Sequence, residues 1–188
     1  MESVGLAGDG FAVGWVAFDG ARQIDEGLAA TPANMVPGSA LGREWINANI
    51  PERVRNPHPT DPIYRLSAQS VRQTFWDKWQ SFGGRAIELW GDTIWPVEAR
   101  FLIQTIDDSR TNESYIVDGG YWTGAVVRRE MDGPYPLLDI CTLFRICVAR
   151  NTLFGKDAPP IEPHNPLEDA RASARKLFRC LRELGIDP

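Results

Sequence analysis

An apolar segment near the start of the chain is the feature that most limits its possible folds. Residues Phe11 to Phe18 are rich in β-forming side chains, and the Asp19-Gly20 pair that follows is typical of a tight hairpin turn. We therefore predict a strand, a turn and a second strand that runs to about Ala29. Because strands and helices alternate after this hairpin, the pattern indicates an α/β domain with a mixed sheet.

The elements after the hairpin are predicted from capping residues, prolines and apolar spacing. Within residues 67–82, Val71, Phe75 and Trp79 recur at four-residue steps, which is typical of a helix face turned to the core. The predicted elements are helices over 39–49, 67–82, 96–105, 140–149 and 166–184, a buried strand over 86–90, a polar connector over 107–114, and proline-rich loops over 51–62 and 157–163.

Length and composition describe a globular chain of one domain, residues 1–188. Its net charge of -5 argues against a protein that coats nucleic acid by bulk charge, and it leaves room for a localised site supplied with metal cations. No apolar run approaches the ~20 residues of a membrane-spanning helix. The first residues have neither a basic segment nor an apolar signal core. We expect a cytoplasmic protein that does not enter the membrane.

The cysteines and histidines argue against disulfides and against zinc. Cys141, Cys147 and Cys180 form no C-x-x-C pair, and an odd number cannot close a complete set of disulfides. We expect reduced cysteines in the core. His58 and His164 are the two histidines, and no cysteine lies at ligand spacing from them, so a zinc site is not expected.

The sequence H-N-P-L-E-D-A-R, which begins at His164, carries the signals of a helix N-terminus. Asn165 suits the N-cap, Pro166 the first helical position, and Glu168 the third, where it can complete a capping box. His164 then precedes the cap and Asp169 takes the fourth helical position, and residues at these two places meet in a hydrophobic staple. An imidazole and a carboxylate would therefore lie side by side at the positive end of the helix. Such a pair is suited to act as a general base and a metal ligand. A surface histidine beside an aspartate, without a function, is the alternative.

This pattern at the start of an alanine-rich helix resembles the third motif of the DEDDh 3′-to-5′ exonucleases, the superfamily of oligoribonuclease, RNase T and polymerase proofreading subunits. Two other segments agree in order. Glu2-Ser3-Val4-Gly5-Leu6 resembles the second half of the family's first motif, D-x-E-x-x-G-L, and L-D-I-C-T-L from Leu138 resembles the D-T-L segment of the penultimate helix. The resemblance covers nearly the whole chain. It implies a ribonuclease H-like fold, a mixed β-sheet flanked by helices.

The resemblance also implies a set of acidic residues that hold two Mg²⁺ or Mn²⁺ ions. Glu2 and Asp169 match the first and third motifs. For the second motif, E-A-R-F-L from Glu98 has the family's spacing with Glu where Asp is usual, while Asp92 has the usual residue type but sits earlier. Glu98 is favoured by its position, and both remain candidates. As alternatives without a ligand role, Glu98 would stabilise its own helix N-terminus and Asp92 would form a turn.

By the same resemblance, the chain would remove nucleoside 5′-monophosphates from the 3′ end of single-stranded RNA or DNA, with RNA slightly favoured. His164 would take the proton from the attacking water, a task suited to an imidazole near neutral pH. Gly5 and Leu6 would contact substrate, with Leu6 wedged against the terminal base, or Leu6 would belong to the core. A homodimer is expected because oligoribonuclease and RNase T pair up. The alternative function is a nucleic-acid-binding module that keeps the fold without catalysis.

The family's first motif opens with an aspartate that would lie one residue before Met1, and the strand that carries it would precede the chain as well. That strand is central in the family's sheet. We therefore expect the first strand to be missing and the chain to be destabilised, because backbone groups of the neighbouring strands would be unpaired. A start assigned too late, or a truncated copy, is favoured over a pseudo-enzyme.

Overall fold

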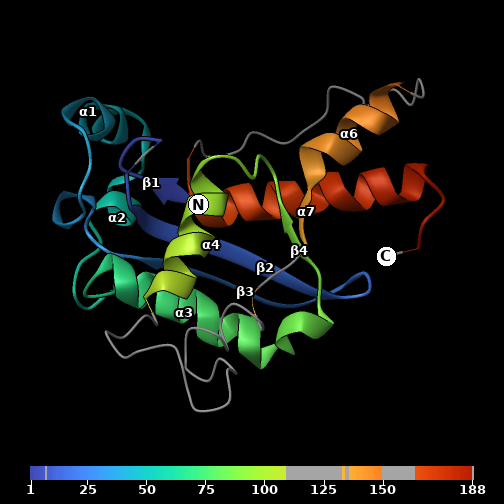
Figure 1. The fold of residues 1–188 in the computed structure, drawn as a ribbon, viewed down its shortest axis with the longest axis horizontal. Helices are drawn as coiled ribbons and strands as arrows, with labels where there is room; N and C mark the ends of the chain where they lie inside the picture. The colour runs from blue at the N-terminus through green and yellow to red at the C-terminus, as the bar shows by residue number, and fades with distance from the viewer. Residues whose placement is uncertain (7, 109–132, 134–135, 150–163, 188) are drawn as a thin grey trace, which may run out of the picture.

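The structure, a computed structural model, describes residues 1–6, 8–108, 133, 136–149 and 164–187. In these residues a three-stranded antiparallel sheet, a two-stranded parallel sheet and six α-helices form a mixed α/β arrangement (Figure 1). The predicted α/β class is confirmed at this level. The predicted loop over 157–163 and most of the connector over 107–114 lie outside the described residues.

The predicted hairpin consists of β2 (Gly10–Asp19) and β3 (Arg22–Ala30), which pair antiparallel. Gly20 in the turn has a φ of 57°, a conformation that glycine adopts without steric strain. The short strand β1 (Glu2–Ser3) pairs antiparallel with β2 on its other side, so the order in this sheet is β1-β2-β3. β1 thus holds the start of the chain against the N-terminal half of β2.

Helices cover both faces of the hairpin (Figure 1). Successive residues of a strand point to opposite faces, so Val13 packs toward α3 and α4 while Ala12 packs toward α1 and α2. α7 runs along β2, where Phe18 contacts Phe178 edge to face with ring centroids 4.6 Å apart. The helices are α1 (Ala40–Asn49), α2 (Glu52–Arg55), α3 (Ala68–Ser81), α4 (Val97–Asp107), α6 (Ile140–Ala149) and α7 (Pro166–Glu183).

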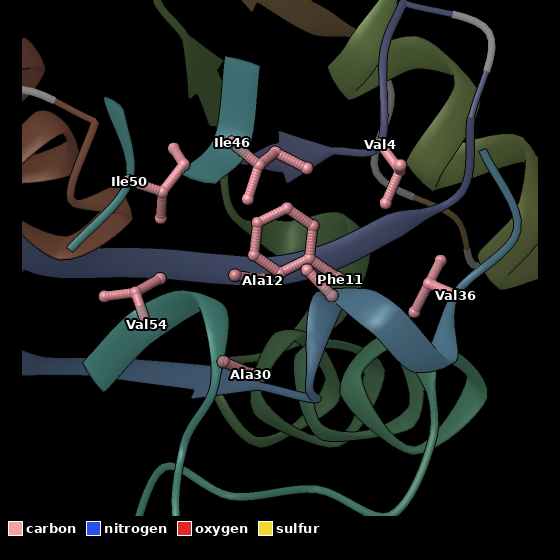
Figure 2. Packing of buried hydrophobic residues seen from close by; sticks show 9 residues of the cluster. Val4, Phe11, Ala12, Ala30, Val36, Ile46, Ile50 and Val54 are labelled. Atoms are coloured by element: carbon pink, nitrogen blue, oxygen red, sulfur yellow. The ribbon is translucent and has the colours of Figure 1, made fainter. Parts of the chain in front are cut away.

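Two apolar clusters form the core of the described residues. Figure 2 shows the first cluster, in which side chains of α1 and α2 surround Phe11. In the second, Phe75 and Phe101 contact edge to face with ring centroids 5.6 Å apart. The predicted core face of α3 is confirmed, since Val71, Phe75 and Trp79 are all buried. The buried residues of the first cluster are Val4, Phe11, Ala12, Ala30, Ala33, Val36, Ile46, Ile50 and Val54.

The predicted buried strand over 86–90 is wrong in its bounds and in its burial. Gly83 and Gly84 have positive φ values of 108° and 56°, and residues Gly84–Ala86 form a 3₁₀ turn. The strand β4 (Leu89–Gly91) begins only after this turn and is half-buried. It pairs in parallel with β5 (Leu137–Asp139), a strand that the sequence pattern did not predict.

The helix boundaries follow the predicted caps closely. Ser39 accepts a hydrogen bond from the Gly42 amide at 3.0 Å, and Ser67 accepts one from the Ser70 amide at 3.2 Å. The segment predicted as a proline-rich loop contains the short helix α2, which follows Pro51, because the fixed φ of proline suits a helix start. None of the helices in the described part of the chain is long and apolar enough to cross a membrane.

Candidate functional site

The N-terminus of α7 is built as its sequence predicts. The Asn165 side chain accepts a hydrogen bond from the Leu167 amide at 3.2 Å, and Pro166 opens the helix. This cap places His164 just before the helix with a φ of 60°, a conformation that residues other than glycine rarely adopt. Glu168, which was predicted to complete a capping box, accepts a hydrogen bond from the Arg171 side chain.

Arg171 fixes the position of α7 relative to the sheet. Its Nε donates to the Glu26 carboxylate of β3 at 2.8 Å, and a second hydrogen bond joins the same two side chains. Together with the bond to Glu168, these contacts tie the first turns of α7 to β3. Asp169 lies in these turns, so the contacts of Arg171 also hold the backbone of Asp169 close to β3.

Glu2 lies on β1 and is almost fully buried, with 9% of its surface exposed. Its Oε1 is 4.0 Å from Nδ1 of His164. Burial, together with the negative charges of Asp169 and Glu98, raises the pKa of Glu2 to about 7, although the positive charge of the Met1 amine opposes this shift. The charges of Glu98 on α4 and Asp169 on α7 therefore both act on Glu2 of β1.

Asp169 and Glu98 complete this group, which we call the acidic cluster: Glu2, Glu98 and Asp169. Burial also raises the pKa of Asp169, against the opposing charges of the Met1 amine and His164. Oε1 of Glu98 accepts a hydrogen bond from the Met1 amine at 3.4 Å. The positive charge of the Met1 amine thus acts on Glu2, Glu98 and Asp169, and it does not fully offset the effect of burial on Glu2 and Asp169.

Asp92 follows β4 and belongs to a different set of contacts. Its carboxylate accepts hydrogen bonds from Cys141 Sγ at 3.0 Å and from Lys176 Nζ at 2.7 Å, and Ser173 Oγ lies at 3.4 Å. Burial alone would raise the pKa of Asp92, but these hydrogen bonds outweigh it and leave the pKa below its usual value. The negative charge of Asp92 also helps to raise the pKa of Asp169, whereas Glu98 acts on Glu2 and accepts a hydrogen bond from the Met1 amine.

An apolar rim lies beside His164. The indole of Trp45 on α1 contacts the imidazole edge to face, with ring centroids 4.7 Å apart and 43% of the Trp45 surface exposed. Leu41, one helical turn earlier on α1, is 76% exposed. Leu6, which follows β1, is 71% exposed, so the alternative that placed it in the core is wrong.

A contact between two glycines holds the segment of Leu6 against α1. Gly5 has a φ of 82°, and a Cβ added to Gly42 in the first turn of α1 would lie 2.8 Å from the Gly5 nitrogen. Any larger residue at position 42 would push this segment away from the helix. Gly5 is therefore a structural residue at this place, and it holds the segment before Leu6 against the first turn of α1.

Sequence reasoning missed Trp45 and Lys176. The only signal for Trp45 is its four-residue spacing from Leu41, which does not say which way that face of the helix points. Lys176 lies in an arginine- and lysine-rich helix, where a single partnered lysine has no local signature. Both contacts depend on how α1 and α7 pack against the rest of the chain.

The acidic cluster has the donor chemistry of a divalent metal site. Carboxylate oxygens are the ligands that Mg²⁺ and Mn²⁺ prefer, and buried acids with raised pKa values gain most from an added positive charge. As placed, however, no three His, Cys, Asp or Glu side chains in the described ranges form a group that could hold a metal ion. The carboxylate oxygens of the acidic cluster are suitable ligands for these ions. To bind one, the three side chains would have to move closer together.

Comparisons with known proteins give this chain no relative. No family model matches it, and neither a curated protein nor a solved structure does so. Any function assigned to the chain therefore rests on its own residues and their geometry.

Proposed function

We propose that this chain is a metal-dependent 3′-to-5′ exonuclease that acts on single-stranded nucleic acid, preferentially RNA, and releases nucleoside 5′-monophosphates. One observation carries the proposal. Glu2, Glu98 and Asp169 lie far apart in the sequence and were selected by their resemblance to the DEDDh motifs, and the charges of Glu98 and Asp169 both act on the buried Glu2 carboxylate. His164, the proposed base, lies 4.0 Å from Glu2.

The arrangement of strands supports a ribonuclease H-like sheet as the finer fold. In the described residues the antiparallel strands β1-β2-β3 and the parallel pair β4 and β5 form two separate sheets, and a ribonuclease H-like sheet would combine both kinds of pairing in one. Helices on both faces of the hairpin agree with this proposal. The acidic cluster draws its members from β1, α4 and α7.

Glu98 is the better second-motif ligand of the two candidates. Its negative charge acts on the buried Glu2 carboxylate and helps to raise the pKa of Glu2. Asp92 is already neutralised by Lys176 and accepts a hydrogen bond from Cys141. We therefore assign Glu2, Glu98 and Asp169 as the residues that would hold two Mg²⁺ or Mn²⁺ ions.

The ions, when bound, would supply electrostatic stabilisation of the phosphate and its leaving oxygen. His164 would accept the proton of the attacking water, since an imidazole exchanges protons readily near neutral pH. The edge contact with Trp45 and the neighbouring Glu2 carboxylate hold the imidazole at the border of the acidic cluster. Trp45, which contacts the base and is partly exposed, offers apolar surface on which a nucleobase at the 3′ end would pack, and Leu41 and Leu6 are exposed apolar side chains on α1 and after β1.

The partners that this proposal implies are the 3′ end of single-stranded RNA or DNA and the two metal ions. A second copy of the chain belongs to the proposal through the family resemblance, and the cytoplasmic location is the one expected from the sequence. A size measurement in solution by light scattering tests the homodimer.

The test is degradation of a 5′-labelled single-stranded RNA by the purified 188-residue chain while Mn²⁺ is titrated. We expect a ladder of products shortened from the 3′ end, with nucleoside 5′-monophosphates released. An RNA with a phosphate on its 3′ end serves as the matched control substrate, and we expect slower degradation of it. Cleavage of a circular RNA, or products shortened from the 5′ end, would contradict the proposal.

A pair of variants separates the two second-motif candidates. Glu98→Gln should abolish the stimulation by Mn²⁺, whereas Asp92→Asn should retain it, because Asp92 is engaged by Lys176 and Cys141. Circular dichroism establishes that both variants fold. The reverse result would assign the ligand to Asp92.

A non-catalytic nucleic-acid-binding module is the second candidate function. It is favoured by the observation that, in the described residues, no three His, Cys, Asp or Glu side chains are placed so that they could hold a metal ion. This module would bind single-stranded RNA with an affinity that does not change with Mn²⁺, and it would release no mononucleotides. Filter binding with and without Mn²⁺, on the same preparation used for degradation, separates the two functions.

A further inference from the structure

Cys141, Lys176 and Asp92 form a compact polar group at a junction of three elements, apart from the acidic cluster. Cys141 lies in the first turn of α6, Lys176 in the middle of α7, and Asp92 follows β4. Nζ of Lys176 is 3.7 Å from Sγ of Cys141, and both side chains donate hydrogen bonds to Oδ1 of Asp92, at 2.7 Å and 3.0 Å.

The surroundings hold this amine beside this thiol. The ring of Phe144, one turn along α6 from Cys141, lies 5.1 Å from Nζ of Lys176. Ser173, one turn before Lys176 on α7, donates to the same carboxylate. Thr93 Oγ1 lies 3.6 Å from Cys141 Sγ. The thiol therefore has an ammonium and a hydroxyl close to it, and both are hydrogen-bond donors.

Cys141 is also the accessible cysteine of the chain. It is half-buried, and the Lys176 side chain is 28% exposed, so a small oxidant can approach the pair from solvent. Cys147 and Cys180 are fully buried. Burial and the neighbouring Cys147 raise the pKa of Cys180 to about 11, which keeps that sulfur protonated and poorly reactive.

We propose that Cys141 and Lys176 form an oxidation-dependent covalent crosslink, a sulfenamide, which joins α6 to α7. Hydrogen peroxide is the oxidant: the Cys141 sulfur attacks one peroxide oxygen, the O–O bond breaks, and sulfenic acid and one water form. The neutral amine of Lys176, after its ammonium proton passes to solvent, attacks this sulfur. The S–N bond forms, the S–O bond breaks, and the hydroxyl leaves with a proton from nitrogen as a second water.

The crosslink replaces an ion pair with an uncharged linkage. Lys176 currently supplies the positive charge beside Asp92, and a sulfenamide nitrogen carries none. Asp92 would then lose both its cation and its thiol donor. The flexible stem of lysine allows Nζ to close the 3.7 Å gap without movement of either helix backbone.

Peptide mapping under non-reducing conditions tests the crosslink, because trypsin separates all the residues involved. Cys141 falls in peptide 130–145, Cys147 in 146–150 and Cys180 in 180–182, while modified Lys176 resists cleavage and remains in peptide 176–179. After peroxide treatment of the folded chain, we expect peptides 130–145 and 176–179 joined, with a total mass about 2 Da below their sum. Dithiothreitol should separate them again.

Two variants provide the controls. Cys141→Ser and Lys176→Arg should each lose the joined peptide, and Lys176→Arg keeps a cation beside Asp92, so the fold around the pair is retained. The inference is overturned if Cys141 is found only as sulfinic or sulfonic acid, or unmodified, while Lys176 is cleaved normally. A bond between Cys147 and Cys180 as the sole crosslink would overturn it as well. None of these results depends on the proposed nuclease activity.

Discussion

Replacement of Glu2 by glutamine should stabilise the protein at alkaline pH, although it removes a residue assigned to the site. Glu2 is 9% exposed, and its environment raises its pKa from 4.5 to about 7. Glutamine has nearly the same shape and carries no charge at any pH. The variant therefore isolates the cost of holding a charged carboxylate in the acidic cluster.

The sign of the effect follows from the raised pKa. Below pH 4.5 the Glu2 carboxyl is protonated in both folded and unfolded chains and costs nothing. As the pH rises toward 7, the unfolded chain loses this proton first, so the wild-type folded state loses stability, and above pH 7 the loss is complete. A shift of this size corresponds to about 3 kcal/mol. For a chain of this length, that is roughly 10 °C in Tm.

Thermal unfolding followed by circular dichroism between pH 4 and pH 8 measures this difference. We expect Glu2→Gln to match the wild type at pH 4 and to exceed it by roughly 10 °C at pH 8. Glu44→Gln, at an exposed position on α1, is the matched control and should leave Tm unchanged at both pH values. Added Mn²⁺ should raise the Tm of the wild type at pH 8 more than that of Glu2→Gln, because a bound cation offsets the same repulsion.

Two results would refute this reasoning. If Glu2→Gln were no more stable than wild type at pH 8, the carboxylate would not be strained by its environment. If Mn²⁺ raised the Tm of both proteins equally, the ion would bind without Glu2, and the assignment of the metal site would be wrong.

The remaining predictions concern the base, the third ligand and two structural positions. His164→Ala should lower turnover about 10²-fold to 10⁴-fold and leave Mn²⁺ binding unchanged in calorimetry, since the imidazole is assigned to water; wild-type turnover would exclude it as the base. Asp169→Asn should weaken Mn²⁺ binding in the same calorimetric assay, and unchanged affinity would remove it from the site. Phe101→Ala should cost about 3–5 kcal/mol in urea denaturation, because Phe101 is 1% exposed and packs on Phe75; a loss below 1 kcal/mol, on the order of a surface substitution, would contradict this. Ser39→Ala should cost about 1 kcal/mol through the lost cap of α1, and an unchanged denaturation midpoint would contradict that.

The sequence was sufficient to predict those turns and helix caps that depend only on residues nearby in the chain. The hairpin turn at Asp19-Gly20 and the caps at Ser39 and Asn165 depend on residues within three positions, and the structure confirms these predictions. The strand over 86–90 failed for the opposite reason. A short strand needs a partner to form, and the partner of β4 is Leu137–Asp139, almost fifty residues later.

The sequence by itself determined the capped start of α7, and with it the positions of His164 and Asp169 at neighbouring places on one helix end. Tertiary structure alone gives Glu98 and Asp92 different surroundings, because Glu98 acts on Glu2 whereas Asp92 accepts a hydrogen bond from Lys176. The contact between the rings of Trp45 and His164 likewise depends on how α1 packs against the rest of the chain. Contacts between distant segments arise from the burial of apolar faces against a shared sheet, and this buried arrangement leaves no local pattern in the sequence.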